Sequence, residues 1–146
     1  VLRMQNEPMI NRDFYISFEL EKMLFHILEC LKEFKNTEEI PDTISLLQNY
    51  LEHHFAQDIT LEAMAGFTGI SKYHLCRQFK KYTGFSPREY LIHLRLLQAQ
   101  MLLQSTEIPC YKIGIMVGFT NEANFIQHFK KAFDMPPGEY RNTIKN

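Results

Sequence analysis

Two stretches of the sequence place hydrogen-bonding side chains and lysines along one face of a predicted helix. In Ser71–Tyr90, the residues at helical spacing on that face are Tyr73, Cys76, Arg77 and Lys80. In Asn121–Tyr140, they are Ala123, Gln127 and Lys130. Arginine can donate two hydrogen bonds to guanine, glutamine can pair with adenine, and lysines contact phosphates. Such a face suits a helix in the major groove of DNA, whereas the plainer alternative is a solvated helix surface.

The same two stretches repeat each other. Aligned at an offset of fifty residues they agree at six of twenty positions, namely Phe79 and Phe129, Lys80 and Lys130, Lys81 and Lys131, Pro87 and Pro137, Glu89 and Glu139, and Tyr90 and Tyr140. Each copy follows a shorter predicted helix and a tight turn, so the repeated unit is a helix-turn-helix module. Because the outward face is duplicated along with the rest, the repeat favours recognition over a merely solvated surface.

The elements that must position these faces are helices. The stripe predicted to be buried consists of Ser71, Leu75, Phe79 and Tyr82 in the first copy, and of Phe125, Phe129 and Phe133 in the second. Thr60, Ser71 and Asn121 are predicted N-caps, and Ser86, Pro87 and Glu89 form a capping box that starts a long helix over 87–104. Pro109 opens a helix that ends near Gly118, and "PPGEYR" is predicted as a last short turn.

The predicted fold class is all-α, because no segment alternates like a half-buried strand. Two helix-turn-helix subdomains, at about 43–85 and 107–141, are joined by the long helix and form a domain over 42–146. Residues 1–41 contribute an amphipathic helix and a linker marked by Pro41. The apolar stripe of that helix is Leu20, Leu24, Ile27, Leu31 and Phe34. It fits packing on the chain's own core, a homodimer contact, or the end of a missing N-terminal domain.

Composition narrows the classes of function. The 146-residue chain has a net charge of -1, and the excess of two positive charges over residues 42–146 is weak evidence for a polyanionic partner. Cys30, Cys76 and Cys110 are too scattered for a disulfide framework or a zinc site, so no metal or cofactor is expected. The sequence lacks a signal peptide pattern and a membrane-spanning run, which predicts a cytoplasmic protein. It also lacks the residue sets of common active sites, so no enzyme activity is expected.

From about Thr43 to Arg141 the sequence resembles the C-terminal DNA-binding domain of AraC/XylS-type bacterial transcription regulators. The resemblance is carried by "ITLEAMA", "SKYHLCRQFKKYTGFSPREYL", "RLLQAQMLL" and "VGFTNEANFIQHFKKAFDMPPGEYR". It implies two recognition helices in successive major grooves of double-stranded DNA, and often an N-terminal effector or dimerisation domain. It also implies base contacts by Tyr73, His74, Cys76, Arg77, Glu122, Ala123, Asn124 and Gln127. We expect phosphate contacts from Lys72, Lys80, Lys81, Asn121, Lys130 and Lys131.

Two departures from the family pattern, at Gly114 and at Glu122 and Ala123, qualify this resemblance, and Arg95 needs an interpretation of its own. Gly114 stands where the family usually has alanine, and we expect it to loosen its helix by up to about 1 kcal/mol. Glu122 and Ala123 are poor partners for phosphates or purines, so the first module is expected to dominate specificity. Arg95, in the long helix, is expected to be a structural ion-pair partner rather than a base reader.

The leading hypothesis is a sequence-specific transcription regulator, an activator that contacts RNA polymerase. Its effector and target site are unknown. The first alternative is a protein interaction module that recruits the transcription machinery with little DNA affinity of its own. The second is a DNA-repair alkyl transferase, because AraC-type domains are also fused to such enzymes. That activity needs clustered cysteines, which this sequence lacks.

Overall fold

The computed structural model describes residues 24, 27, 28 and 41–145. Residues 41–145 form the helices α2 (Asp42–His54), α3 (Leu61–Thr68), α4 (Lys72–Thr83), α5 (Pro87–Ser105), α6 (Cys110–Met116), α7 (Glu122–Phe133) and α8 (Pro137–Lys145). They contain no strand, which confirms the all-α class. The proposed dimer stripe lies outside the described residues, apart from Leu24 and Ile27.

Side-chain caps start four of these helices where the sequence predicts them. Thr60, Ser71 and Asn121 each accept a hydrogen bond from the backbone N–H three residues later, at 3.1, 3.3 and 2.8 Å. At α5 the capping box is complete, because Ser86 Oγ accepts from the Glu89 N–H while Glu89 Oε2 accepts from the Ser86 N–H. Local hydrogen bonding therefore fixes where α3, α4, α5 and α7 begin.

Two helices differ from the prediction. Sequence analysis marks no helix start between Pro41 and Thr60, yet α2 occupies this segment and buries Ile44, Leu47 and Leu51. The predicted last short turn is instead the start of α8, a helix of nine residues. Each helix is amphipathic and is stabilised by packing of its apolar face against the core. Capping residues alone do not reveal such packing.

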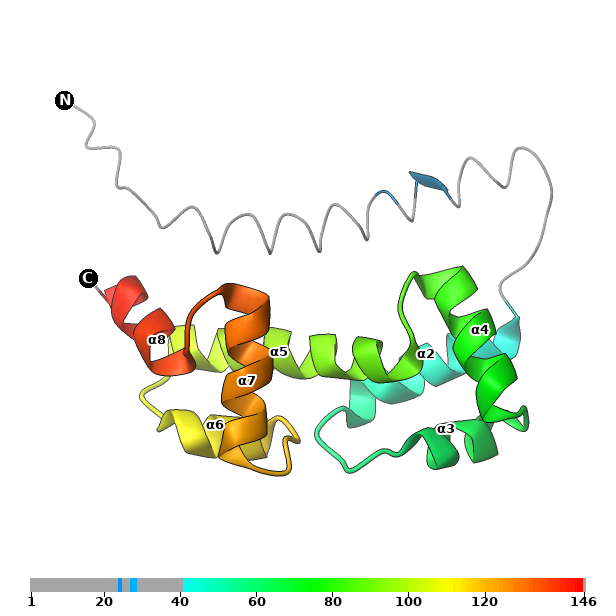
Figure 1. Cartoon of the computed structure of the whole chain (residues 1–146), viewed down its shortest axis with the longest axis horizontal. Helices are drawn as coiled ribbons and strands as arrows, with labels where there is room; N and C mark the ends of the chain where they lie inside the picture. The colour runs from blue at the N-terminus through cyan, green and yellow to red at the C-terminus, as the bar shows by residue number, and fades with distance from the viewer. Residues whose placement is uncertain (1–23, 25–26, 29–40, 146) are drawn as a thin grey trace.

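Residues 41–145 enclose two hydrophobic cores, and α5 contributes to both. The first core contains the buried residues Ile44, Leu47, Leu51, Met64, Leu75, Phe79, Tyr90 and Leu91. The second contains Leu96, Ala99, Leu103, Ile113, Val117, Phe119, Phe125, Phe129, Phe133 and Tyr140. The first half of α5 thus completes one module, and its second half begins the other. Figure 1 shows α5 running between the two groups of helices.

The repeated tyrosines attach to corresponding helices in the two modules. Tyr90 Oη donates to Glu52 Oε1 of α2 at 2.6 Å. Tyr140 Oη accepts from Gln100 Nε2 and Gln104 Nε2 of α5, each at 2.9 Å. The second half of α5 therefore supports the second module in the way that α2 supports the first, by a hydrogen bond to the repeated tyrosine.

Gly114 has a packing role that the sequence does not reveal. It is buried in α6, and a Cβ atom there would lie 2.7 Å from Phe125 Cδ1 and 2.8 Å from Phe125 Cγ. The absence of a side chain lets α6 approach the aromatic face of α7 closely. The expectation of a merely loosened helix is thus corrected: glycine carries a propensity cost, but alanine would not fit without movement of Phe125.

Arg95 is structural, as expected: its hydrogen bonds go to carbonyl groups, and the carboxylate of Asp58 interacts with its guanidinium electrostatically. Its Nε donates to Phe55 O and its Nη2 donates to Gln57 O, both at 2.8 Å. These carbonyls lie just beyond the end of α2. Arg141 makes the corresponding contact in the second module, because its Nη2 donates to Ile108 O at 2.6 Å. An arginine thus donates to backbone carbonyls just after α2 in the first module and just after α5 in the second.

Candidate nucleic-acid interface

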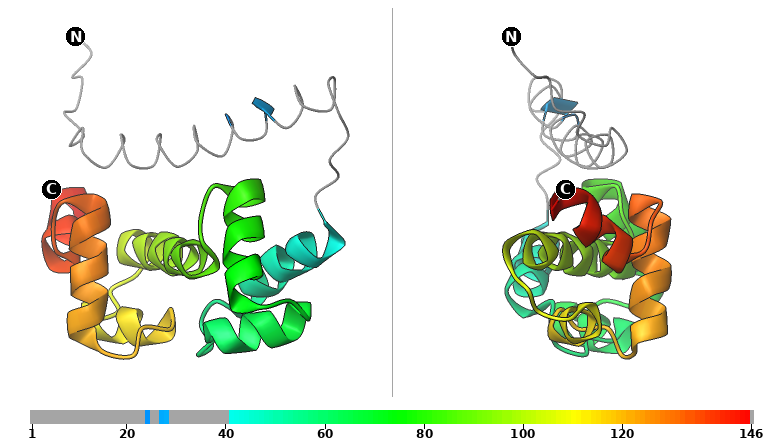
Figure 2. Two further views of the ribbon diagram at one scale, coloured as in Figure 1. Left: turned by 45° about the vertical axis from the view of Figure 1, so that its right-hand side comes forward. Right: turned by 90° about the vertical axis from the view of Figure 1, so that its left-hand side faces the viewer.

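Helices α4 and α7 lie on the same face of the molecule and run in the same direction. In Figure 1, α7 crosses in front of α5, whereas α4 lies beyond the start of α5 and crosses in front of α2. The turned view in Figure 2 shows the two helices upright on either side of α5, with their first residues at the same end. Each is the second helix of its helix-turn-helix pair, α3–α4 or α6–α7. This is the arrangement expected of two recognition helices presented to one surface.

The inner faces of α4 and α7 are fixed by aromatic packing. The predicted buried stripe is wrong at Ser71, which is exposed as the N-cap of α4, and Tyr82 is only half-buried. Leu75 and Phe79 are fully buried in the first core, and Phe125 and Phe129 are fully buried in the second. The rings of Phe129 and Phe133 lie 4.3 Å apart between centroids. Each helix therefore cannot rotate about its axis without disrupting the core, and its outer face has a defined orientation.

On the outer face of α4, three of the four residues expected to contact bases are fully available. Tyr73 is 74% exposed, and His74 and Arg77 are also exposed. Cys76 is half-buried, so it projects less than the sequence pattern suggested. The outer stripe of α4 is therefore centred on Tyr73 and Arg77.

On α7, the outer face combines an amide with small and apolar groups. Glu122, Ala123 and Gln127 are exposed, whereas Asn124 is half-buried. Ile126, which aligns with Cys76 at the offset of fifty, is 36% exposed beside them. The outer stripe of α7 can offer an amide to adenine and methyl groups to thymine.

Two of the expected phosphate contacts already have partners within the chain. Lys72 Nζ donates to Glu62 Oε1 of α3 at 2.7 Å, and this pairing lowers the pKa of the Glu62 carboxyl group. Asn121 uses its side-chain oxygen to cap α7. Contact between Lys72 and a phosphate would thus require exchange of a solvent-exposed ion pair, which costs little.

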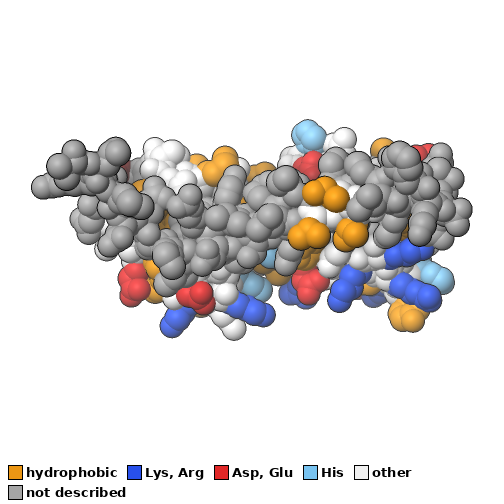
Figure 3. All heavy atoms as spheres, turned by 90° about the horizontal axis from the view of Figure 1, so that it is seen from above, with side chains coloured by type: hydrophobic (Ala, Val, Ile, Leu, Met, Phe, Trp, Pro, Cys, Tyr) orange, Lys and Arg blue, Asp and Glu red, His pale blue; other side chains and the backbone are white. Residues whose placement is uncertain are grey.

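The paired lysines lie in the last turns of α4 and α7. Lys80, Lys81, Lys130 and Lys131 are all exposed. Figure 3 shows lysine and arginine side chains, with some acidic side chains among them, along the lower edge of the view, which corresponds to the face that carries α4 and α7. Lysines grouped at the ends of two such helices are typical of a surface that contacts a phosphate backbone.

Arg88 is a further cationic residue that sequence analysis used only as part of a helix start. It is exposed in the first turn of α5. The pKa of His128 in α7 lies below its ordinary value because burial disfavours the charged ring and because Lys131 and Arg88 repel it. Arg88 of α5 therefore acts on the charge of a residue in α7.

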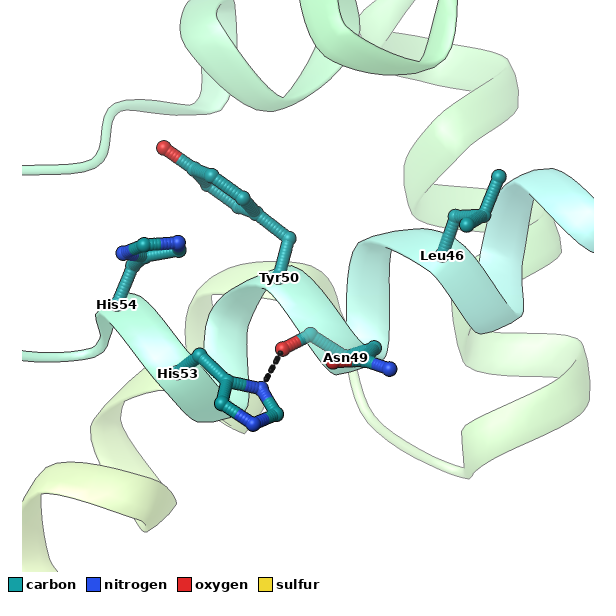
Figure 4. Close-up of a pocket in the computed structure, with 5 residues that line it drawn as sticks. All are labelled: Leu46, Asn49, Tyr50, His53 and His54. Carbon is teal, nitrogen blue, oxygen red and sulfur yellow. Dashed lines mark hydrogen bonds between the residues drawn. The ribbon is translucent and has the colours of Figure 1, made fainter.

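A separate surface feature lies on α2. A shallow pocket of about 370 Å³ is lined by Leu46, Asn49, Tyr50, His53 and His54 (Figure 4). The His53 Nδ1–H donates to Asn49 O at 2.8 Å, and Tyr50 stacks on Phe67 with ring centroids 4.8 Å apart. None of the lining residues belongs to α4 or α7, so the pocket is not part of the candidate interface.

None of the described helices combines the length and the apolar character that a membrane span requires.

Comparison with known proteins identifies this arrangement. Residues 64–143 match a helix-turn-helix domain family. The chain is 34% identical over 107 residues to the HTH-type transcriptional activator RhaS of Escherichia coli, a match that covers 73% of this chain and 38% of RhaS. The chain therefore spans less than two-fifths of the length of that curated relative.

Two solved structures have the same fold. The C-terminal domain of AraT, a response regulator from Geobacillus stearothermophilus, is 34% identical with a TM-score of 0.68, covering 73% of this chain and 88% of that one. A transcriptional regulator with an AraC-type DNA-binding domain from Chromobacterium violaceum is 28% identical with a TM-score of 0.63, covering 70% and 92%. The chain therefore belongs to the AraC-type family of helix-turn-helix DNA-binding domains of transcription regulators, which is not a class of enzymes.

Proposed function

We propose that residues 42–146 form the DNA-reading domain of a sequence-specific transcription regulator, with α4 and α7 in successive major grooves of double-stranded DNA. The observation that carries this proposal is the parallel placement of two amphipathic helices on one face, each with an exposed donor at its centre (Figure 2). Arg77 supplies that donor on α4, and Gln127 supplies it on α7. Family membership supports the proposal independently.

In this proposal the two modules contribute unequally to base specificity. In the first, Tyr73, His74, Cys76 and Arg77 read bases, and the exposed guanidinium of Arg77 favours guanine. In the second, Glu122, Ala123, Asn124 and Gln127 face a site richer in A·T pairs. Because a bidentate arginine contact discriminates strongly, the first module dominates specificity.

The output of the regulator is also a proposal. RhaS is a transcriptional activator. By analogy we assign activation to this chain, which implies contact with RNA polymerase and action in the cytoplasm, where bacterial DNA lies. Residues 1–41 would then be the end of an effector-binding or dimerising part, and the Leu20–Phe34 stripe would form a homodimer contact.

Selection of bound sequences from a random pool of DNA duplexes tests the function directly. The expected result is one bipartite site, with a half-site containing guanine and a second half-site rich in A·T pairs. Binding of the selected duplex is then measured by fluorescence anisotropy against a shuffled duplex at the same salt concentration. Equal affinity for both duplexes would contradict the proposal and favour the interaction module.

A further inference from the structure

We propose that Arg95 and Gly118 form a clasp that holds the two modules at one fixed spacing, so that the chain measures the distance between two DNA half-sites as well as reading their bases. This inference rests on the proposed function for its meaning. The clasp itself is a feature of the junction between the modules, and it can be tested without DNA.

The first half of the clasp is the guanidinium of Arg95. It is half-buried, and it donates to the carbonyl oxygens of Phe55 and Gln57, both at 2.8 Å. These residues form the loop that leaves α2 and leads into α3. Since Arg95 lies in the middle of α5, the two hydrogen bonds tie the loop of the first module to the helix that both modules share.

The second half is Gly118, in the turn between α6 and α7. Its φ of 101° lies in the region that favours glycine. A Cβ atom there would be 2.9 Å from each of three atoms, namely Phe55 O, Ala56 O and Arg95 Nε. The turn of the second module thus lies directly against the loop of the first and against the arginine that holds it.

Two aromatic residues fill the rest of the junction. Phe55 packs against both hydrophobic cores. Phe119 follows Gly118 directly, and the Arg95 guanidinium lies 5.8 Å from the centre of its ring. Phe119 is two residues before Asn121, the cap of α7. The start of α7 therefore cannot move relative to the α2–α3 loop unless these contacts break.

The consequence for DNA follows from its geometry. Adding one base pair between two half-sites moves one of them by about 3.4 Å along the axis and turns it by about 35° around the axis. A rigid pair of modules cannot follow both changes, whereas modules joined only by a helix and loose loops adapt more easily. The clasp therefore makes affinity depend on spacing.

The experiment compares binding to duplexes in which zero, one or two base pairs are inserted between the selected half-sites. Arg95→Met keeps much of the side-chain bulk but removes both hydrogen bonds. Arg141→Met is the matched control, because Arg141 also donates to a backbone carbonyl, Ile108 O, but within the second module alone. Arg95→Lys keeps the charge but lacks the rigid guanidinium fork whose separate nitrogens serve the two carbonyls.

The wild-type chain and Arg141→Met are expected to lose at least about tenfold in affinity on insertion of one base pair. Arg95→Met is expected to bind the original site more weakly and to lose much less on insertion, with Arg95→Lys between them. A steep dependence on spacing in Arg95→Met, or none in the wild type, would overturn the clasp. Failure of the wild type to prefer any DNA would instead overturn the proposed function.

A measurement on the free protein separates the two proposals fully. Spin labels are attached at Lys81→Cys and Lys131→Cys after replacement of the three native cysteines by serine. Electron paramagnetic resonance then gives the distribution of distances between α4 and α7. The expected distribution is narrow in the background chain and with Arg141→Met, and broad with Arg95→Met. Equal widths in all three chains would rule the clasp out whether or not the chain binds DNA.

Discussion

At the scale of single residues, the proposed reading of DNA by the first module is tested most directly at Arg77. Its guanidinium is exposed at the centre of the outer stripe of α4. We expect Arg77→Ala to weaken binding to the selected site by about 1 to 3 kcal/mol and to relax the base preference at one position. Fluorescence anisotropy with the four possible base pairs at each position measures both effects.

A matched control for that variant is Lys145→Ala. Lys145 pairs with Glu107 away from α4 and α7, so its replacement removes one positive charge without touching the proposed reading surface. Affinity should change little and base preference not at all. The role of Arg77 would be refuted if both variants lost affinity equally on every sequence.

Gly114 and Gly66 provide opposite predictions for the same substitution. Gly66→Ala should stabilise the chain by up to about 1 kcal/mol, because its site in α3 has no heavy atom within 4 Å of a new Cβ. Gly114→Ala should destabilise it by about 1 to 3 kcal/mol, because the new Cβ would collide with the buried ring of Phe125. Urea denaturation of the two variants measures both changes, and stabilisation by Gly114→Ala would show that α6 and α7 can separate at little cost.

These two glycines also show what the sequence can predict about single residues. Both lie within helices, and helix propensity alone gives glycine the same free-energy cost relative to alanine at the two positions. The difference arises from Phe125, eleven residues from Gly114, whose ring lies where the side chain would be. The burial of Leu75, Phe79 and the three phenylalanines of α7 was predictable, because helical spacing alone determines which residues share a face.

At the scale of elements, the capping box of α5 contributes local stability to the helix that both modules share. Ser86→Ala removes the acceptor for the Glu89 N–H and should cost about 1 kcal/mol. Ser45→Ala, at an exposed position inside α2, is the control and should change stability by no more than about 0.5 kcal/mol. Comparable destabilisation of the two variants, measured by urea denaturation, would mean that the cap does not contribute.

The same box predicts a dependence on pH. Hydrogen bonds from the backbone and the side chain of Ser86 lower the pKa of Glu89. Because the folded pKa lies below the unfolded one, the stabilisation is present above the unfolded value and is lost as the pH falls through the folded value. The stability difference between the wild type and Glu89→Gln should therefore shrink between about pH 6 and pH 3. A constant difference over that range would contradict the role of the ionised carboxylate.

The last turns of α4 and α7 are expected to control the salt dependence of binding. Replacing Lys80, Lys81, Lys130 and Lys131 by glutamine should make the plot of log affinity against log salt shallower, by about 0.9 for each phosphate that the variant no longer neutralises. Base preference should remain. The control replaces Lys112 and Lys145, outside α4 and α7, and should leave the slope unchanged. An unchanged slope in the fourfold variant would contradict binding of the phosphate backbone by these turns.

Helix starts were predictable wherever a side chain marks them. Thr60, Ser71, Ser86 and Asn121 all make the predicted cap contacts, because the interaction spans only three residues. The start of α2 has no such mark, since Pro41 offers no side-chain hydrogen bond and the helix is fixed by its buried face. Local signals therefore predicted the starts of α3, α4, α5 and α7, but they missed α2, whose place depends on contacts with the core.

At the scale of the whole molecule, the second module should not fold without α5. A fragment over 106–145 lacks Leu96, Ala99 and Leu103, which belong to its core, and also lacks Gln100 and Gln104, which bond Tyr140. A fragment over 87–145 keeps all of them. Thermal unfolding followed by circular dichroism should be cooperative for the longer fragment and featureless for the shorter one, and a cooperative transition in the shorter fragment would contradict this account.

The relation between the modules was the part of the fold least accessible to the sequence. The repeat predicted two modules and a long helix between them, and both are present. The hydrogen bonds of Arg95 join residues 38 and 40 positions apart, and the contact of Gly118 with the α2–α3 loop spans an even longer separation. No periodicity or cap encodes such pairs, so the outer faces of α4 and α7 were predictable singly but their mutual placement was not.

Helix α5 also bears on the ancestry of the chain. At the offset of fifty, α8 corresponds to the first half of α5. The second half of α5 corresponds to α2, because Gln104 of α5 hydrogen-bonds to Tyr140 and Glu52 of α2 hydrogen-bonds to the equivalent Tyr90. An ancestral unit would thus have begun and ended with a helix. Joining two copies would have merged the last helix of one with the first helix of the next. The seam of that duplication then lies inside an unbroken helix, so neither copy could later be deleted without taking part of the other's core.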